Sequence, residues 1–242
     1  MIKKITDPDK DPLGCMMIDY IKGDPAVFVQ VDSTNLDMWQ MTGKTMFRTY
    51  STMDEIEHRA LRLCRGRILD AGAGSGCHSL WLQAQGHLVD ALDVSCGSVR
   101  VMREQKVRHI IHDSFFCLKN RQYNTILMLM NGIGITGSLD GLNLFFQSLS
   151  DILAPGGRVI TDSTDLAGLY PENALIQAQG DYYGQTEFTM RYNTIKSDPF
   201  DWLYIDFDTL SWFAAGHGFA CRKILSGNSG KYLAVITRRS QP

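Results

Sequence analysis

The stretch ILDAGAGSG, residues 68–76, decides the fold of this chain. Arg67 to Ala71 form a short apolar run that predicts a strand, and Cys77 to Gln85 predict a helix. Three glycines alternate with small residues between these two elements. Glycine is required where a turn needs backbone angles that a side chain resists, or where a ligand touches the backbone. We therefore predict a strand, a tight turn and a helix whose N-terminus offers free N–H groups to a ligand.

The spacing of the glycines indicates which ligand suits this turn. A dinucleotide-binding turn, G-x-G-x-x-G, would place its third glycine at position 77, which is Cys77. Asp70 stands two residues before Gly72, where its charge suits an ammonium group and would repel a pyrophosphate. Both observations disfavour a nicotinamide dehydrogenase. By itself, the stretch also fits a structural turn that holds no ligand.

Strands and helices alternate along the chain after the turn. Further strands are predicted at residues 88–92, 108–111, 124–130 and 158–162, and helices at residues 98–105 and 142–153. This alternation predicts an α/β fold with a doubly wound parallel sheet, which binds ligands at the carboxyl ends of its strands. Asp93 ends the second strand, 23 residues after Asp70, and suits ribose hydroxyls; Asp90 is the competing carboxylate.

Polar residues also follow the third and fourth predicted strands. Asp113 can accept a hydrogen bond from an exocyclic amine, and the ring of Phe115 can lie against a base. Met130-Asn131-Gly132 follows the fourth strand, where the chain leaves the edge of the sheet. The sequence therefore predicts one ligand site built from the ends of successive strands.

The flanking segments are less regular than this core. The first 50 residues, broken by prolines, predict an N-terminal extension, or lid, that packs on the core. Thr52 and Glu55 have the spacing of a capping box and predict the start of a helix. Residues 164–205 are rich in Tyr, Asp and Asn and predict an insertion, with an exposed antiparallel strand at 187–192 that leaves room for edge pairing. A helix capped by Asp208 is predicted at 209–215, and a hairpin at 220–225 and 232–237.

Composition argues against two classes of protein. The chain has 242 residues and a net charge of −2, which argues against a broad nucleic-acid footprint but not against a local basic patch. The longest apolar run, Ile126 to Met130, is far short of the roughly 20 residues that a helix needs to cross a bilayer. The N-terminus MIKKITDPDKDP has no apolar signal core, so we expect a cytoplasmic protein. The six cysteines are scattered without a CxxC pair and predict neither a disulfide framework nor a metal site.

Five segments resemble, in order and roughly in spacing, the motifs of class I S-adenosylmethionine-dependent methyltransferases. They are ILDAGAGSG, ALDVS around Asp93, HDSFF around Asp113, LMLMNGIGI around Asn131 and LAPGGRVITDS around Gly156. The resemblance covers residues 50–165 strongly, and the C-terminal helix and hairpin resemble the closing antiparallel strands of the family. More loosely, MFRTYSTMDEIE and GDYYGQTEF resemble an uncharacterised bacterial branch. The resemblance implies a Rossmann-like seven-stranded sheet, mostly parallel with an antiparallel last strand, and a methyltransferase domain over residues 51–242.

The resemblance also implies how each matching residue acts on S-adenosylmethionine. The three glycines let the backbone approach the methionine part of the cofactor, and Asp70 helps to hold its ammonium group. Asp93 holds the ribose hydroxyls, and Asp113 faces the adenine amine with Phe115 nearby. Asn131 borders the sulfonium and the substrate. The predicted cofactor-binding residues are Asp70, Ala71, Gly72, Ala73, Gly74, Gly76, Asp93, Val94, Asp113, Ser114, Phe115, Met130, Asn131 and Gly132.

These features predict methyl transfer to a small-molecule acceptor, with S-adenosylhomocysteine as the product. The substrate would be covered by the N-terminal extension and by residues 164–205, and tyrosines suit small organic molecules because they combine a flat face with a polar tip. The substrate-side candidates are Arg48, Tyr50, Ser163, Asp165, Tyr182 and Tyr183. We assign no catalytic residue, because a general base is needed only if the acceptor arrives protonated.

Several alternatives stay open at the level of the sequence. The chain also fits a non-catalytic S-adenosylmethionine-binding protein, or a methyltransferase that acts on protein or RNA. Amino-methylation of DNA is disfavoured, because Met130-Asn131-Gly132-Ile133 stands in place of an Asp/Asn-Pro-Pro-aromatic run. Asp162 and Asp165 lack a clear third ligand, so no metal site is predicted.

We expect a monomer or a homodimer. We also expect the His78 side chain to lie at the surface and the Trp212 side chain in the core.

Overall fold

The computed structural model describes residues 5–169 and 182–239 of the chain. The chain divides into two compact units, each of which is described by itself. Unit 1 is Met1–Met53, Gly66–Leu118 and Glu187–Phe200, and unit 2 is Asp54–Arg65, Lys119–Thr186 and Asp201–Pro242. The predictions made for the first four residues and for residues 170–181, which belong to the expected insertion, lie outside the described residues.

Short elements make up both units. In unit 1 they are α1 (Pro12–Ile21), β1 (Phe28–Ser33), β2 (Trp39–Thr42), α2 (Gly43–Met46), β3 (Arg67–Ala71), α4 (Cys77–Ala84), β4 (Leu88–Asp93), α5 (Cys96–Glu104), β5 (His109–His112) and β9 (Ile195–Lys196). In unit 2 they are α3 (Glu55–Leu63), β6 (Tyr123–Met128), α6 (Leu139–Ile152), β7 (Leu153–Thr164), α8 (Phe207–Gly216), β11 (Phe219–Ser226) and β12 (Lys231–Arg238). Two strands, β8 (Gln185–Tyr192) and β10 (Phe200–Leu203), have residues in both units.

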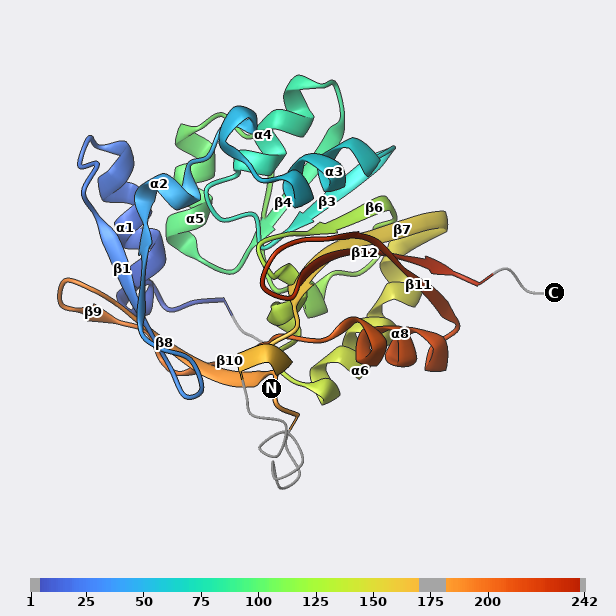
Figure 1. Cartoon of the computed structure of the whole chain (residues 1–242). Helices are drawn as coiled ribbons and strands as arrows, with labels where there is room; N and C mark the ends of the chain where they lie inside the picture. The colour runs from blue at the N-terminus through green and yellow to red at the C-terminus, as the bar shows by residue number, and fades with distance from the viewer. Residues whose placement is uncertain (1–4, 170–181, 240–242) are drawn as a thin grey trace. The chain divides into compact units, whose positions relative to one another are not determined.

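The strands form two hydrogen-bonded sheets (Figure 1). The larger has seven strands in the order β11-β12-β7-β6-β3-β4-β5, and the smaller follows the order β10-β8-β1-β2, with β9 paired to β8. Pairing is parallel between β3 and β4, β4 and β5, and β6 and β7. It is antiparallel where β12 meets β7 and β11. The predicted doubly wound α/β fold, mostly parallel with an antiparallel last strand, is therefore confirmed.

The apolar strands are buried because helices cover them. In unit 1 the helices α4 and α5 pack on β4, and Ala91 of β4 lies in a core cluster with Val99 and Met102 of α5. In unit 2 the helices α6 and α8 lie together, with α8 against β11 and β12, while α3 packs on β7 and β12 (Figure 1). Ile126, Leu127 and Met128 of β6 are fully buried. An uninterrupted apolar run in a parallel strand follows from burial of both faces.

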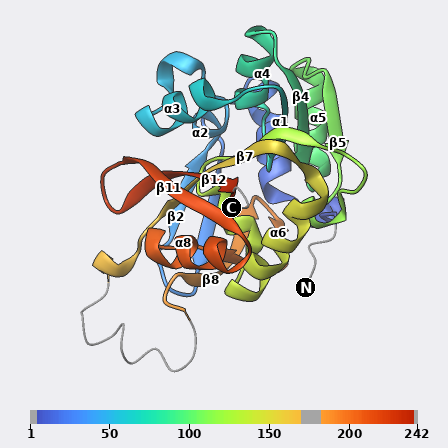
Figure 2. The same cartoon turned by 90° about the vertical axis from the view of Figure 1, so that its right-hand side faces the viewer.

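A single carboxylate, Asp11, ties helix α1 to helix α5 inside unit 1. The two helices lie side by side (Figures 1 and 2). Asp11 is buried and accepts hydrogen bonds from Gly14 N and Gly97 N, both at 3.0 Å, and from Ser95 Oγ at 2.6 Å. It therefore satisfies free N–H groups in the first turns of two helices. Gly14 and Gly97 let the two backbones approach closely at this point.

Two predicted helix caps are wrong. Helix α3 begins at Glu55, not at Thr52, because Asp54 and Glu57 form the capping box: Glu57 N donates to Asp54 Oδ1 at 2.8 Å and Asp54 N to Glu57 Oε2 at 3.0 Å. The sequence holds two overlapping capping boxes, Thr52 with Glu55 and Asp54 with Glu57. Thr52 of the earlier box is the last residue of a 3-10 turn at Tyr50–Thr52. Helix α8 is capped by Asp206, whose Oδ1 accepts from Thr209 N at 2.8 Å, and not by Asp208.

Three statements about exposure are also corrected. The strand at 187–192 is no free edge, because β8 pairs with β1 and β10 on its two sides. Periodicity indicates which face of a strand is buried, but not which strands pair with it. His78 is buried at 5% exposure instead of lying at the surface, and Trp212 is 72% exposed instead of lying in the core.

None of the helices in the described ranges is long and apolar enough to cross a membrane.

Candidate cofactor site and substrate-side residues

The glycine turn after β3 uses left-handed backbone angles at all three glycines. The φ angles of Gly72, Gly74 and Gly76 are 78°, 57° and 84°. A side chain resists this conformation, which explains the alternating pattern. Gly72 N and Ala73 N donate to the Leu92 carbonyl at 2.9 and 3.0 Å, so the turn is bound to the end of β4. A Cβ at Gly76 would lie 2.8 Å from Val107 Cγ2, so packing excludes a side chain there as well.

Asp93 joins the ends of three strands in unit 1. Its Oδ2 accepts from Gly74 N at 2.8 Å and its Oδ1 from Ser95 N at 2.9 Å. Its carbonyl accepts from Asp113 N at 3.2 Å, which brings the end of β5 to the same place. Burial raises the pKa of Asp93, and the Ser95 and Gly74 N–H groups oppose that rise. The structure therefore brings Gly74, Asp93 and Asp113 together, as the strand ends predicted.

The competing carboxylate, Asp90, is occupied elsewhere. It is 3% exposed, and its Oδ2 forms an ion pair with Arg67 Nη2 at 2.7 Å. It lies within β4, three residues before the carboxyl end of the strand. These contacts agree with the choice of Asp93 over Asp90.

Asp70 is more deeply placed than the sequence indicated. It is 2% exposed, and its Oδ2 accepts from Ser79 Oγ in helix α4 at 2.6 Å. Burial raises its pKa, while the charge of His78 and the hydrogen bond of Ser79 lower it. Sequence reasoning missed both partners, although Ser79 lies on the first turn of the helix that follows the glycines. The predicted contact of Asp70 with an ammonium group stays a prediction.

The segment after β5 forms a short turn against the core. Asp113 is partly buried, and its Oδ1 accepts from Ser114 N at 2.7 Å. A 3-10 helix follows at Phe115–Cys117, in which Phe115 is 4% exposed and packs edge-on against Phe116. Ser114 is buried and Val94 is partly buried. The predicted adenine contacts of Asp113 and Phe115 stay predictions.

The segment after β2 lies against the glycine turn within unit 1. Ser75 Oγ donates to the Met46 carbonyl, and a Cβ at Gly74 would lie 3.1 Å from Met46 Cε. Tyr50 stacks on Trp81 of helix α4, with ring centroids 4.6 Å apart and planes 11° from parallel. Arg48 donates to the Thr45 carbonyl. Of the substrate-side candidates, Arg48 and Tyr50 therefore lie on the segment that contacts the glycine turn.

The Met130–Gly132 turn of unit 2 has an unusual backbone. Met130 and Asn131 have φ angles of 64° and 56°, a conformation that costs energy in residues other than glycine. Asn131 N donates to Asp162 Oδ1 at 2.8 Å, and Thr164 Oγ1 donates to Asn131 Oδ1 at 2.8 Å. Met130 and Asn131 are partly exposed, whereas Gly132 is buried. Two residues of β7 therefore hold the turn.

Four of the substrate-side candidates fall in unit 2, but they play different parts there. Tyr183 OH donates to Asp165 Oδ1 at 2.7 Å, and Tyr182 OH donates to Asp206 Oδ2 at 2.6 Å. Burial raises the pKa of both tyrosines, and hydrogen bonds to the carboxylates add to it. Ser163 is fully buried, and its Oγ accepts from Ile205 N at 3.0 Å. The structure thus groups Tyr182, Tyr183 and Asp165 around Asp206, which the sequence did not single out.

Asp162 contacts the Met130–Gly132 turn and has a raised pKa, which predicts how the stability of the protein changes with pH. Burial raises its pKa to about 6 despite the positive charge of Lys231. A folded-state pKa above the unfolded value stabilises the protein at low pH, and this contribution is lost as the pH rises through about 6.

We therefore expect wild type to lose about 2 kcal/mol of stability relative to Asp162→Asn between about pH 4.5 and pH 7.5. Urea unfolding of both proteins at the two pH values measures the difference. A constant difference in unfolding free energy across this range would contradict the prediction.

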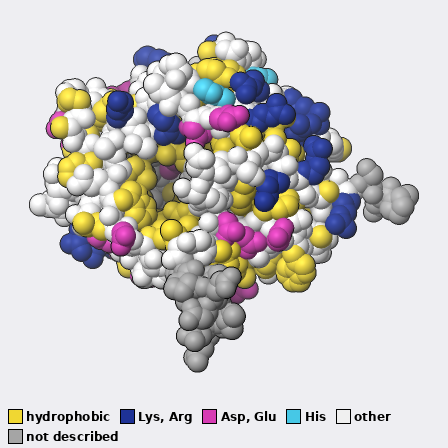
Figure 3. Space-filling model, in the orientation of Figure 1, with side chains coloured by type: hydrophobic (Ala, Val, Ile, Leu, Met, Phe, Trp, Pro, Cys, Tyr) yellow, Lys and Arg dark blue, Asp and Glu magenta, His cyan; other side chains and the backbone are white. Residues whose placement is uncertain are grey.

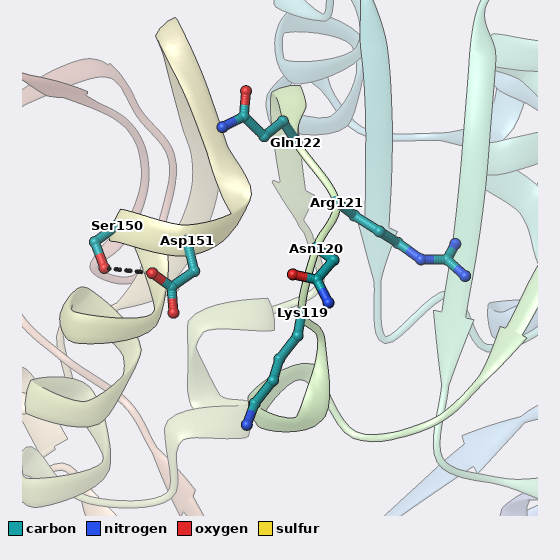
Figure 4. Close-up of a pocket in the computed structure, with 6 residues that line it drawn as sticks. All are labelled: Lys119, Asn120, Arg121, Gln122, Ser150 and Asp151. Atoms are coloured by element: carbon teal, nitrogen blue, oxygen red, sulfur yellow. Dashed lines mark hydrogen bonds between the residues drawn. The ribbon is translucent and has the colours of Figure 1, made fainter.

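An open surface pocket of about 650 Å³ lies elsewhere in unit 2 (Figure 4). It is lined by the segment before β6 and by the end of helix α6, where Ser150 Oγ donates to Asp151 Oδ1 at 3.1 Å. Its lining residues are Lys119, Asn120, Arg121, Gln122, Ser150 and Asp151. It contains none of the predicted site residues and adjoins the amino end of β6, whereas ligands of this fold class bind beyond the carboxyl ends of the strands.

Within residues 5–169 and 182–239, no three His, Cys, Asp or Glu side chains are grouped as metal ligands would be.

The seven-stranded sheet, mostly parallel with antiparallel last strands, matches the Rossmann-like methyltransferase fold. A solved S-adenosylmethionine-dependent methyltransferase from Bacteroides fragilis, in complex with S-adenosyl-L-homocysteine, matches with 40% identity and a TM-score of 0.91, over 98% of this chain and 99% of that one. The chain belongs to the family of S-adenosylmethionine-dependent methyltransferases. No protein-family model matches it, and no match was found among curated proteins.

More distant structures share the fold alone. The CcbJ methyltransferase from Streptomyces caelestis is 15% identical, with a TM-score of 0.59 over 79% of this chain and 95% of that one. The glycopeptide N-methyltransferase MtfA, solved with S-adenosyl-L-methionine, is 14% identical, with a TM-score of 0.54 over 76% of this chain and 93% of that one. At these identities the comparison extends to the architecture and not to the substrate.

Proposed function

We propose that this chain transfers a methyl group from S-adenosylmethionine to a nucleophile on a small-molecule acceptor. The observation that carries the proposal is the carboxylate of Asp93 bound to the amide of Gly74 in the glycine turn, in a chain of this family. That contact places an acidic group at the glycine turn, in which Gly74 is buried and Gly72, two residues earlier, is exposed. S-adenosylmethionine is the cofactor, as in the family to which the chain belongs.

The residues present fit this cofactor. Three glycines with positive φ leave the backbone of the turn free of side chains, and a Cβ at Gly74 would press on Met46. In the proposed site the glycine turn holds the methionine part of the cofactor and Asp93 its ribose, with Asp113 and Phe115 at the adenine. The proposed place of Asn131 is beside the sulfonium. Bound S-adenosylmethionine supplies a methyl group that is already activated on a positively charged sulfur.

The chain itself is then required to orient the acceptor and to exclude water. Alignment of two bound reactants supplies roughly 7–11 kcal/mol of a barrier. An acceptor lone pair that takes the methyl group leaves a neutral thioether behind, and an acceptor that arrives protonated also gives up a proton. We propose that the segment with Arg48 and Tyr50 covers the cofactor, because it already contacts the glycine turn.

The location of positive charge in unit 2 favours a small acceptor. Lys and Arg side chains gather over α3 and the neighbouring ends of β6 and β7, as a comparison of Figure 3 with Figure 1 shows. Arg158 lies there near Arg65 and Arg222, and its pKa is lowered by burial and by those two charges. Arg158 pairs with Thr125 near the start of β6, whereas the Asn131 turn follows the carboxyl end of that strand. An RNA acceptor would need positive charge beside the acceptor site, because Lys and Arg side chains neutralise its phosphates. The positive charge lies near the opposite end of β6, which favours a small acceptor.

Binding of S-adenosylhomocysteine tests the proposal directly. We expect micromolar affinity by calorimetry. At 100 times the dissociation constant, we expect a rise in melting temperature of roughly 5–10 °C, because a ligand that binds only the folded state adds about 2.7 kcal/mol. A nicotinamide dinucleotide at the same concentration is the control and should leave the melting temperature unchanged. Absence of binding by folded, ligand-free protein would refute the proposal, and binding would justify a screen of small-molecule acceptors for methyl transfer.

A further inference from the structure

Asp162 of β7 is completely buried beneath the Met130–Gly132 turn. Its Oδ1 accepts hydrogen bonds from the backbone N–H groups of Asn131, at 2.8 Å, and of Gly132, at 3.4 Å. Both donors come from the turn with left-handed backbone angles. A carboxylate that accepts from two successive backbone N–H groups fixes their direction, and an ionised acceptor forms stronger bonds than a neutral one.

A second residue of β7 holds the same turn. Thr164 stands two positions after Asp162, on the same face of the strand, and its Oγ1 donates to Asn131 Oδ1 at 2.8 Å. Asn131 is therefore held through its backbone N–H and through its side chain. Non-glycine residues keep left-handed angles only where surrounding contacts impose them, and these contacts come from β7.

Lys231 supplies the counter-charge for Asp162. Lys231 Nζ lies 3.6 Å from Asp162 Oδ2 and 2.7 Å from Asp54 Oδ2, at the start of helix α3. Among the described residues, Asp162 Oδ2 has no hydrogen-bond partner, and the charge of Lys231 is the largest of the effects that favour the ionised carboxyl. The other ionisable groups that act on the pair are Glu57, which acts on Lys231, and Tyr204, whose pKa is raised to about 12 by burial and by the charge of Asp162.

We propose that Asp162 is a positioning residue, whose ionised carboxylate, paired with Lys231, holds Asn131 and Gly132 in the conformation that receives the cofactor. The inference rests on the proposed function, because the place of Asn131 beside the sulfonium belongs to that proposal. Protonation of Asp162 weakens its bonds to the two N–H groups and removes its attraction to Lys231. Cofactor affinity should therefore decrease as Asp162 takes up a proton.

The test measures the affinity for S-adenosylhomocysteine between pH 5 and pH 8 in four proteins. Wild type should bind about tenfold more weakly at pH 5 than at pH 7.5. Asp162→Asn should bind about tenfold more weakly than wild type at pH 7.5 and should show no such pH dependence. Lys231→Met should move the transition to higher pH, because loss of the cation favours the protonated acid. Asp151→Asn, a matched change at an exposed position, should behave as wild type, which accounts for any titration of the ligand itself.

Amide hydrogen exchange of Asn131 and Gly132 gives a readout that does not depend on ligand. Protection of both amides should decrease below pH 6 in wild type and should be low at every pH in Asp162→Asn. If wild type fails to bind S-adenosylhomocysteine at any pH, the proposed function is wrong and this inference is overturned with it. If wild type binds, but neither Asp162→Asn nor Lys231→Met changes the pH profile, only the inference is overturned. Should Asp162→Asn not fold, Lys231→Met decides the question alone.

Discussion

Replacing Asp93 with alanine is expected to weaken binding of S-adenosylhomocysteine by about 100-fold, which corresponds to about 2.7 kcal/mol. Two effects add. The carboxylate proposed for the ribose hydroxyls is removed, and hydrogen bonds to a charged group contribute about 1.5–3 kcal/mol. The amides of Gly74 and Ser95, which donate to Asp93 at 2.8 and 2.9 Å, also lose their acceptor. The glycine turn then keeps its backbone bonds to the Leu92 carbonyl but loses its side-chain bond to the end of β4. Titration calorimetry at pH 7.5 measures the affinity.

Asp90→Asn is the matched control on the same strand. Asp90 is a buried acid paired with Arg67 at 2.7 Å, so the change should lower stability while the affinity of the folded protein stays within about twofold. Unchanged affinity in Asp93→Ala would show that the ribose-binding acid lies elsewhere. Equal losses of affinity in both variants would show that binding follows the integrity of the sheet and not the carboxylate of Asp93.

Gly97→Ala is expected to lower the free energy of unfolding by about 3 kcal/mol. A Cβ at Gly97 would lie 2.6 Å from the carbonyl carbon of Gly14 and 2.9 Å from its oxygen. These atoms belong to the backbone of helix α1, so no change of rotamer relieves the clash and the helices must separate. Separation would also break the bonds that Asp11 accepts from Gly97 N and Ser95 Oγ. Urea unfolding followed by circular dichroism measures the loss.

Gly216→Ala is the control for that measurement. Gly216 ends helix α8, and apart from its chain neighbours and the backbone of its own helix, no described residue has an atom within 4 Å of a Cβ placed there. Alanine is the better helix former, so we expect a change within about 0.5 kcal/mol or a slight gain. A Gly97→Ala protein as stable as wild type would show that α1 does not pack on α5 at this distance in solution.

The strands and most helices were predictable because their signals are local. The apolar run from Arg67 to Ala71 ends where the glycines begin, and the strand has these bounds in the structure. The carboxyl ends of the strands then located Asp93 and Asp113, which the structure joins through a backbone hydrogen bond. The helix caps were less predictable, because several nearby residues fit a capping pattern at each helix. Thr52 and Asp54 compete at α3, and Asp206 and Asp208 compete at α8; in each case the tertiary structure selects one of the two.

The sequence by itself determined the strand, glycine turn and helix, because steric limits on the backbone and the burial of apolar runs act over a few residues. The tertiary structure alone decided that β8 is paired on both sides, that Asp11 reaches Gly97, and that Asp162 lies between Asn131 and Lys231. Each of these contacts joins residues far apart in the chain. Periodicity and spacing carry no information on which distant polar groups meet, because that depends on the path of the whole chain and on the requirement that buried polar groups find partners.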